Sequence, residues 1–263
     1  MQNNSLSFIH PDAKIGRNVT IGPFTTIYNN VEIGDDTIIG PNVTIYSGAR
    51  IGQNCQIHTG AVISSVPQDL KFEGEDTVAV IGDHTVIREF VTVNRGTQAS
   101  KQTLVGSHCL LMAYVHVAHD CIIGDRVILV NAVQLAGHIT VGDHAVIGGA
   151  SAVHQFVSIG AHVMVAGGSM ILKDVPPYIM AARKPLRYDG INRRGLRRRS
   201  FSNEEIYRIQ DIYRIIFQSG LNYSQAIAEV EKSIPDSTEK ECIVSFFKKS
   251  STTGRGIIKG IQK

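Results

Sequence analysis

The sequence contains no tryptophan, few other aromatic residues and only four cysteines. Cys55, Cys109, Cys121 and Cys242 show no close spacing such as C-x-x-C, which argues against the usual zinc-binding patterns and predicts reduced thiols. No segment approaches the roughly 20 consecutive apolar residues of a membrane-spanning helix. The N-terminal residues lack the basic and then apolar pattern of a secretion signal. These absences predict a cytoplasmic protein that does not span a membrane.

Charge is also scarce, because Asp, Glu, Lys and Arg make up only 19% of the chain and the formal net charge is +3. A charge this small does not indicate nucleic-acid binding, so we expect no nucleic-acid partner. The basic residues gather in one segment, 193–199 (RRGLRRR), while hydrophobic residues amount to 43% and can bury a core.

What the sequence does contain is a repeat of six residues. Of the 28 positions that follow one another at this spacing from Ile9 to Ile171, 25 are aliphatic, and the exceptions are Asp69, Glu75 and Ala99. An α-helix repeats at 3.6 residues and a strand at 2, so neither gives this period. A short strand followed by a corner does, and three such units close a triangular coil. Stacked coils would pair as parallel strands about 4.8 Å apart, which predicts a parallel β-helix with the aliphatic residues inside.

Two polar segments, 64–80 and 94–104, interrupt the repeat and are predicted to form loops that leave the β-helix. They are either tolerated insertions or binding loops on a rigid scaffold, and Asp69 and Lys71 favour binding for the first. Pro176 and Pro177 cannot continue a strand ladder. We therefore divide the chain into a β-helix at 1–176 and an α-helical domain at 177–263.

The second part begins with a basic segment, 178–199, which we expect to be irregular. Three helices should follow at about 203–218, 223–232 and 237–249, since apolar residues recur there at helical spacing. Ser202 and Glu205 have the spacing of a capping box for the first helix, and Asp236 is the expected cap of the third. The tail after Ser250 is expected to be loose.

The register divides the ten histidines into groups. His84, His108, His144 and His162 each lie three places after an inward position, which indicates turn residues. His119, His138 and His154 belong to inward positions that are one coil apart, so their side chains should lie at successive levels of one edge, with His116 beside them. Such a column suits catalysis, although imidazoles that only hydrogen-bond across a subunit interface would give the same pattern.

Asp120 directly follows His119, and its carboxylate could accept a hydrogen bond from the imidazole Nδ1. That bond would leave Nε2 free to act as a general base, but adjacent residues need a bent backbone to form it. Gly137 lies beside His138, where a backbone N–H could approach a reacting oxygen closely.

The repeat resembles that of the hexapeptide-repeat acyltransferases. Five motifs occur in the order that is typical of one branch of them: Gln68-Asp69-Leu70-Lys71, His116-x-x-His119-Asp120-Cys121, Ala136-Gly137-His138, Val153-His154-Gln155-Phe156 and Asp174-Val175-Pro176-Pro177-Tyr178. With the helical C-terminus they resemble, over nearly the whole chain, the UDP-N-acetylglucosamine O-acyltransferases that open lipid A synthesis. The resemblance implies a left-handed β-helix, a homotrimer, and no cofactor or metal.

The same resemblance implies a reaction and its residues. A 3-hydroxyacyl group would move from acyl carrier protein to the glucosamine 3-hydroxyl of UDP-N-acetylglucosamine, with His119 as general base and the Gly137 N–H as oxyanion donor. The residues implied to contact substrate or product are Asp69, Lys71, His116, His138, His154 and Gln155, and those near the nucleotide are Asn192, Arg198 and Arg199. Guanidinium groups suit a diphosphate, although the arginine run could equally be a solvated surface. Gly167 matches the position that limits acyl length, and Arg194 departs from the family by replacing a Glu.

Other functions remain open from the sequence. One is an N-acyltransferase acting on a 3-amino UDP-sugar, or the later lipid A N-acyltransferase, whose extra N-terminal domain is hard to place when the coils begin by Ile9. A different class is a zinc hydratase like the γ-class carbonic anhydrases, in which three histidines from two subunits hold zinc and water is the fourth ligand. A scaffold without catalytic activity is the third.

Overall fold

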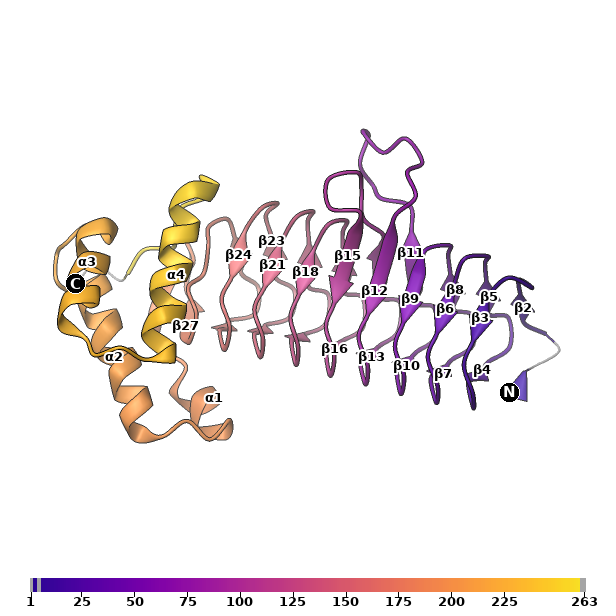
Figure 1. Ribbon diagram of the computed structural model, residues 1–263, viewed down its shortest axis with the longest axis horizontal. Coiled ribbons are helices and arrows are strands. Elements are labelled where there is room, and N and C mark those ends of the chain that lie inside the picture. Colours follow the sequence, from indigo (N-terminus) through magenta and orange to yellow (C-terminus); the bar gives the residue numbers. More distant parts are fainter. Residues whose placement is uncertain (1, 4–5, 261–263) are drawn as a thin grey trace.

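The computed structural model describes residues 2–3 and 6–260 and has the shape of a long prism with helices at one end (Figure 1). Very short strands alternate with corners, and each strand except the last pairs in parallel with strands of the adjacent coils. Ile21, Ile39 and Ile57, for example, recur every 18 residues and lie in register on one face. The period of six therefore gives three strands per coil, as predicted.

The strands form three sheets, which are the faces of the prism. The first face contains β1 (Gln2–Asn3), β4 (Thr20–Ile21), β7 (Ile38–Ile39), β10 (Gln56–Ile57), β13 (Val86–Ile87), β16 (Leu110–Leu111), β19 (Ile128–Leu129), β22 (Val146–Ile147), β25 (Met164–Val165), β27 (Ile179–Ala182) and β28 (Arg187–Ile191). The second contains β2 (Phe8–Ile9), β5 (Thr26–Ile27), β8 (Thr44–Ile45), β11 (Val62–Ser65), β14 (Thr92–Asn94), β17 (His116–Val117), β20 (Gln134–Leu135), β23 (Ala152–Val153) and β26 (Met170–Ile171). The third contains β3 (Lys14–Ile15), β6 (Glu32–Ile33), β9 (Ala49–Ile51), β12 (Val78–Ile81), β15 (Gln102–Val105), β18 (Ile122–Ile123), β21 (Thr140–Val141) and β24 (Ser158–Ile159).

Three edges join these faces. The His119 edge follows the second face and contains His119, Asp120, Gly137, His138 and Phe156. The His162 edge follows the third face and contains His84, His108, His144 and His162. The Gly167 edge follows the first face and contains Phe90, Tyr114 and Gly167. The four histidines of the His162 edge all have φ between 56° and 59°, a left-handed conformation that the corner requires. Their predicted role as turn residues is therefore confirmed.

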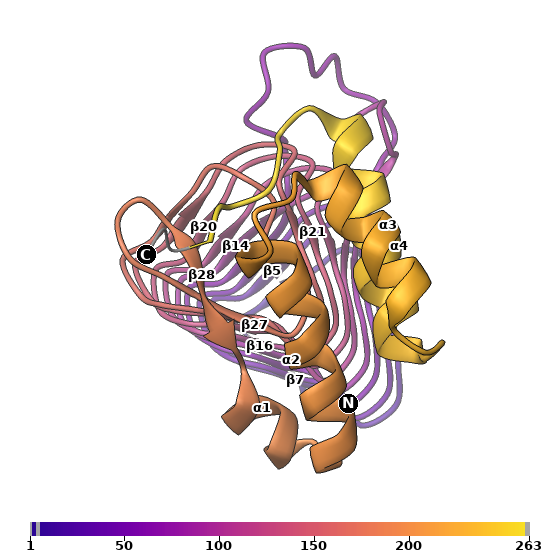
Figure 2. The ribbon, with the colours of Figure 1, turned by 90° about the vertical axis from the view of Figure 1, so that its left-hand side faces the viewer.

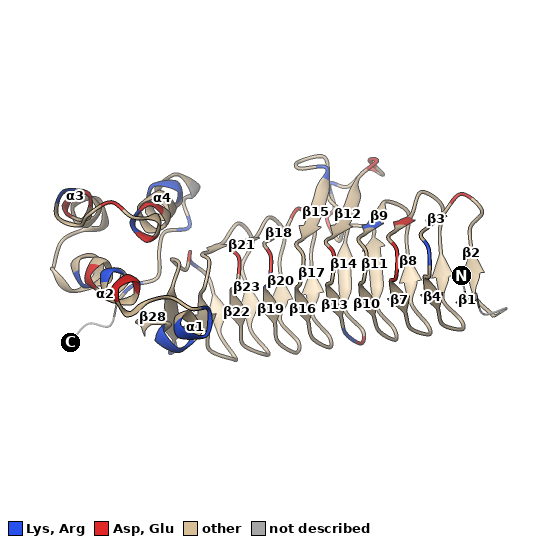
Figure 3. Ribbon diagram, turned by 60° about the horizontal axis from the view of Figure 1, so that its bottom comes forward, with Lys and Arg blue, Asp and Glu red and all other residues tan. Residues whose placement is uncertain are grey.

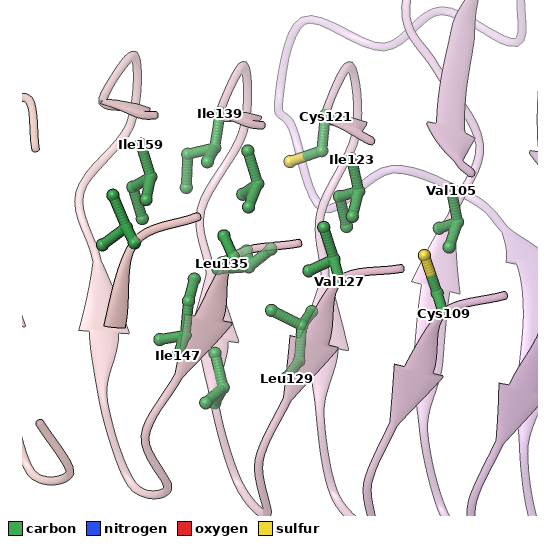
Figure 4. Packing of buried hydrophobic residues seen from close by; sticks show 14 of the residues in the cluster. Val105, Cys109, Cys121, Ile123, Val127, Leu129, Leu135, Ile139, Ile147 and Ile159 are labelled. Carbon is green, nitrogen blue, oxygen red and sulfur yellow. The ribbon is translucent and has the colours of Figure 1, made fainter. Parts of the chain in front are cut away.

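The aliphatic residues of the repeat fill the interior of the prism. Leu111, Ile123, Leu129 and Leu135 are fully buried, and Figure 4 shows side chains of successive coils stacked inside the faces. Burying each such side chain contributes roughly 1.5–3 kcal/mol relative to leaving it exposed. Candidate catalytic residues are therefore to be sought outside this aliphatic interior.

Two excursions leave the prism next to each other, between β11 and β12 and between β14 and β15 (Figure 1). Across them Ile51 pairs with Ile81, and Ile81 pairs with Val105, so the coils close again in register. The unpaired loops span 66–77 and 95–101 and are shorter than the expected 64–80 and 94–104, because the flanking residues extend the strands.

The C-terminal part covers one end of the prism (Figure 2). It contains α1 (Arg193–Arg198), α2 (Asn203–Gln218), α3 (Tyr223–Ser233) and α4 (Thr238–Thr253). The three predicted helices correspond to α2, α3 and α4, and the capping box of Ser202 and Glu205 is present. Among the described residues, no helix is long and apolar enough to cross a membrane.

Three expectations for this part were wrong. The segment 178–199 is ordered, because β27 pairs with β25 in parallel and with β28 in an antiparallel hairpin, and α1 follows. The cap of α4 is Ser237, whose side chain accepts from the backbone N–H of Lys240, and not Asp236. The described part of the tail after Ser250 is packed, since Ile257 and Ile258 are buried beside Asp174, while 261–263 lie outside the described residues. The division of the chain after residue 176 stays a prediction, and β27 continues the first face beyond it.

Candidate active site

His119 and Asp120 form a buried pair on the His119 edge. The imidazole Nδ1 lies 2.7 Å from Oδ2 of Asp120, and the two residues are only 7% and 4% exposed. The bent backbone that this contact needs is present, because Asp120 has a φ of 60°. A carboxylate at this place fixes Nδ1 as the protonated nitrogen, so Nε2 is the atom available as a base.

The carboxylate of Asp120 is held by donors from the loop 95–101. Thr97 donates its N–H to Oδ1 at 3.0 Å and its hydroxyl to Oδ2 at 2.7 Å, and the Ser100 hydroxyl donates to Oδ1 at 2.5 Å. Burial alone would raise the pKa of Asp120, but the hydrogen bonds from Ser100, His119 and Thr97 outweigh it and hold the pKa below its usual range. Asp120 is therefore a carboxylate at neutral pH.

Gly137 lies directly against the imidazole of His119. A Cβ atom at this position would be 2.7 Å from Nε2 and 2.6 Å from Cε1, so only glycine leaves the ring its place. On the His162 edge the N–H groups at the equivalent corner position, as in Gln53 and Ser107, donate to an aspartate of the next coil. Within the described part of the chain, the Gly137 N–H has no such acceptor. It is available to a developing negative charge.

A groove of about 750 Å³ runs past this pair, and the loop 66–77 forms its far wall. The residues that line it are Gln68, Asp69, Leu70, Lys71, His116, Ala118, His119, Gln134, Leu135, Ala136, Gly137, Ala152, Val153 and Gln155. Asp69, Lys71, His116 and Gln155, which were expected to contact substrate, are therefore brought together with His119. The exposed Lys71 and the half-buried Asp69 are linked by a hydrogen bond from the Lys71 N–H to Asp69 Oδ1 at 3.0 Å.

Two further histidines surround the pair. The His138 ring meets His119 edge-on at 5.2 Å between centroids and stacks on Phe156 at 4.7 Å. His116 Nδ1 lies 2.7 Å from the Thr92 hydroxyl. Burial lowers the pKa of both; for His138 the charge of Asp120 opposes this effect without reversing it, so both rings are neutral at physiological pH. His138 Nε2 lies 3.7 Å from Asp120 Oδ2, against 2.7 Å for His119 Nδ1, so His119 makes the closer contact with the carboxylate.

His154 lies one coil further on, and its side chain is exposed. Its Nδ1 lies 3.1 Å from the carbonyl of Gln155, and it does not line the groove of the single chain, whereas Gln155 does. The predicted column of histidines at successive levels of one edge is present, because Val117, Leu135 and Val153 are paired in register.

The residues expected near the nucleotide lie on a different edge. Asn192 caps α1 and donates to the carbonyl of His162 at 2.9 Å, and Arg199 donates to the carbonyl of His144 at 2.8 Å. Arg198 is exposed on α1, where arginines gather (Figure 3). Asn192 and Arg199 therefore contact the His162 edge, and Gly167 is exposed on the Gly167 edge. Within one chain the structure does not bring either set to the His119 groove.

A metal could be considered at His119, Asp120 and His138, whose ligand atoms lie within 4.8 Å of one another. Asp120 Oδ2, however, already accepts from the Thr97 hydroxyl and faces His119 Nδ1, and Oδ1 accepts from Thr97 and Ser100. Thr97 and Ser100 thus donate to the carboxylate of Asp120, and the carboxylate accepts the proton on His119 Nδ1. This arrangement suits hydrogen bonding and not a metal ion.

Sequence reasoning missed Thr97 and Ser100, because nothing in a polar loop indicates that it folds back on Asp120.

Comparisons with known proteins show which family this chain resembles. The family described as Bacterial transferase hexapeptide (six repeats) matches residues 12–47, 30–65 and 102–137, and the one described as Udp N-acetylglucosamine O-acyltransferase; Domain 2 matches 174–258. An acyl-[acyl-carrier-protein]–UDP-N-acetylglucosamine O-acyltransferase of Chlorobaculum parvum is 60% identical over 97% of this chain and 98% of its own length. That of Aquifex aeolicus is 59% identical over 95% and 96%.

Solved structures lead to the same family. A UDP-N-acetylglucosamine acyltransferase from Bacteroides fragilis superimposes with a TM-score of 0.95 at 51% identity, covering 98% of this chain and all of its own. A UDP-N-acetylglucosamine O-acyltransferase from Moraxella catarrhalis gives 0.94 at 37% identity, covering 98% of this chain and 100% of its own. The predicted left-handed β-helix with a small helical domain is confirmed, and neither the N-acyltransferase nor the zinc hydratase is favoured. The chain belongs to the UDP-N-acetylglucosamine O-acyltransferases of the hexapeptide-repeat family.

Proposed function

We propose that this acyltransferase moves a 3-hydroxyacyl group from the thioester of acyl carrier protein to the glucosamine 3-hydroxyl of UDP-N-acetylglucosamine, the first step of lipid A synthesis, with His119 as the general base. The names of the relatives supply the donor and the acceptor. The observation that carries the mechanism is the buried His119–Asp120 pair, whose Nε2 lies beside Gly137 in the groove.

The steps follow from these atoms. His119 Nε2 takes the proton of the sugar hydroxyl while its oxygen attacks the thioester carbonyl carbon. The Gly137 N–H donates to the carbonyl oxygen as that atom becomes negative. The C–S bond then breaks, and the imidazolium returns its proton to the departing thiolate. General-base assistance is worth roughly 10²–10⁴-fold, and one oxyanion donor about 10²–10³-fold.

Asp120 supports both proton transfers. Its carboxylate orients the imidazole and stabilises the imidazolium, because its pKa is held low and it stays charged throughout. Asp69, Lys71, His116, His138, His154 and Gln155 are proposed to position the sugar and the acyl group. The thioester is already activated, so no cofactor and no covalent enzyme intermediate are required.

We also propose that the working unit is a homotrimer with grooves between neighbouring chains. The His119 edge and the His162 edge belong to different corners of one prism, so a substrate that contacts both sets of residues needs two chains. Apolar side chains on the outside are in accord with such contacts, since Tyr114 is 60% exposed, Met170 63% and Leu172 54%. Sedimentation of the purified protein should give three times the mass of one chain.

The cytoplasmic location stays a prediction, in keeping with four free cysteines.

An acyl-transfer assay tests the proposal. The purified protein is offered UDP-N-acetylglucosamine or the matching 3-amino sugar nucleotide, each with a series of 3-hydroxyacyl thioesters of acyl carrier protein of increasing length. We expect an ester on the 3-hydroxyl sugar and a preference for one chain length. Faster transfer to the amino sugar would replace this function by that of an N-acyltransferase.

A further inference from the structure

The loop 95–101 surrounds Asp120 and supplies four of its hydrogen-bond donors. They are the N–H and hydroxyl of Thr97 and the N–H and hydroxyl of Ser100. On the other side of Asp120, its own N–H donates to the Thr103 hydroxyl at 2.9 Å. Neither Thr97 nor Ser100 lines the groove. Their side chains therefore face Asp120 and not the substrate, and the Ser100 hydroxyl, which has one hydrogen, lies 2.5 Å from Asp120 Oδ1 and 2.8 Å from the Gln102 carbonyl.

The loop is built to hold this arrangement. A Cβ at Gly96 would lie 2.3 Å from the backbone nitrogen of Gln102, so glycine is needed for the loop to close tightly. The Gly96 N–H donates to the carbonyl of Val78, and the Arg95 guanidinium lies over the Phe72 ring at 5.4 Å. The loop is thus tied both to the prism and to the first excursion, which lines the groove.

We propose that Thr97 and Ser100 are positioning residues for the transfer: they hold the Asp120 carboxylate in place and set how much negative charge it presents to His119. The Thr97 hydroxyl donates to Oδ2, the same oxygen that faces His119 Nδ1. Each donor draws electron density from the carboxylate, so it weakens the attraction between Asp120 and an imidazolium. The second excursion is then a catalytic support. This inference rests on His119 being the base.

The sign of the effect follows directly. Removing the two hydroxyls leaves a more basic Asp120, which stabilises the protonated form of His119 and raises its pKa. A base must be unprotonated to work, so the acid limb of the pH–rate profile should move to higher pH. The other ionisable groups around His119 are His116, His138 and, across the groove, Asp69 and Lys71, and neither substitution touches them.

The experiment uses Ser100→Ala and the double variant Thr97→Val with Ser100→Ala. Histidine labelled with ¹³C and ¹⁵N is titrated by NMR, and the His119 signal is assigned by its absence from His119→Gln. We expect the pKa of His119 to rise by about 0.5–1 unit in the double variant. A rise of this size lowers the unprotonated fraction of His119 by at most about three- to ten-fold, so we expect kcat at neutral pH to fall by about three-fold with KM little changed. Thr97→Ser keeps the hydroxyl and should retain the wild-type titration.

Thr85→Val is the matched control, because it also removes a buried threonine hydroxyl, which on another edge donates to the Gly106 carbonyl at 2.8 Å. An unchanged His119 titration in both variants, or the same shift in Thr85→Val, would overturn the inference. Ser100 lies at the surface, so Ser100→Ala should fold even if the double variant melts early. In that case the smaller rise of the His119 pKa in Ser100→Ala alone tests the inference. Normal turnover in His119→Gln would remove the proposed base, yet the NMR shift would still report the action of the loop.

Discussion

The imidazole Nδ1 of His119 lies 2.7 Å from Oδ2 of Asp120, the next residue in the chain. Neighbouring residues in an extended strand point to opposite faces, so this contact depends on the corner. Asp120 lies three places after the inward residue Val117 and takes the left-handed conformation that the corner requires at that position. His138 does the same one coil later. The fold that makes the edge therefore also brings His119 and Asp120 together as the proposed catalytic pair.

Replacing His119 by alanine should reduce acyl transfer by about 10²–10⁴-fold, because His119 is the imidazole held against Asp120 at 2.7 Å with Nε2 beside Gly137. The melting temperature should change little, since the ring lies on the edge and outside the aliphatic interior. Steady-state kinetics and thermal unfolding measure the two effects. His84→Asn is the control: it changes a turn histidine on another edge for a residue that tolerates positive φ, and it should keep full activity.

Gly137→Ala should lower kcat by about 10²-fold or more, with substrate binding less affected. The added methyl group would overlap Nε2 and Cε1 of His119, so the ring must move away from the backbone N–H. Rapid-quench measurement of a single turnover isolates this step. A variant that turns over at the normal rate would show that the imidazole does not need this place.

Subunit mixing tests whether sites lie between chains. His119→Ala chains and chains with both Arg198→Ala and Arg199→Ala should each be inactive. In a ring of three with identical contacts, random mixing makes about a quarter of the sites whole, so roughly a quarter of the activity should return. A mixture of His119→Ala with Gly137→Ala serves as the control, because both residues belong to one edge of the same chain. No recovery in the test would argue for sites within single chains, and recovery in the control would show that His119 and Gly137 serve one site from different chains.

Gly167→Met should shift the preferred donor towards shorter acyl chains. Gly167 is exposed on its edge, and a Cβ there would already lie 3.1 Å from the carbonyl of Gly149, so a long side chain has to extend outwards over the surface. The ratio of kcat/KM for long and short thioesters measures the effect. An equal loss with all chain lengths would mean that Gly167 does not contact the acyl group.

Acid should destabilise the end of the prism. Burial lowers the pKa of His162 from 6.5 to about 4, and the nearby His144 and Arg199 add to this. Between these two pH values the unfolded chain binds more protons than the folded one, so stability falls as pH falls through this range and this group adds no further loss below about 4. The melting temperature of wild type should decline more steeply there than that of His162→Asn. Parallel curves would contradict this.

The prism could be predicted because its sequence pattern is local and repeated. Each aliphatic residue of the repeat marks one strand, and each histidine three places later marks one turn. The caps of α2 likewise depend on residues three apart. The hairpin of β27 and β28 was missed because it lies beyond the six-residue repeat, so no periodic pattern indicates that β27 pairs with β25. The hydrogen bonds from Thr97 and Ser100 to Asp120, and the docking of Arg199 on His144, join segments that are distant in the chain. The register placed the histidines on one edge, but motif resemblance, which pointed to Asn192, Arg198 and Arg199, did not show that they lie away from it.

The stacking of the coils also limits how this site can change. Equivalent positions on one edge recur once per coil, at intervals of about 4.8 Å. The distance between two such groups along the groove is therefore a multiple of this interval. A substrate of intermediate length cannot be accommodated by a small shift of one group towards another. Such a substrate can be accommodated only by replacing the side chain at an existing level, or by inserting or deleting an entire coil of the β-helix.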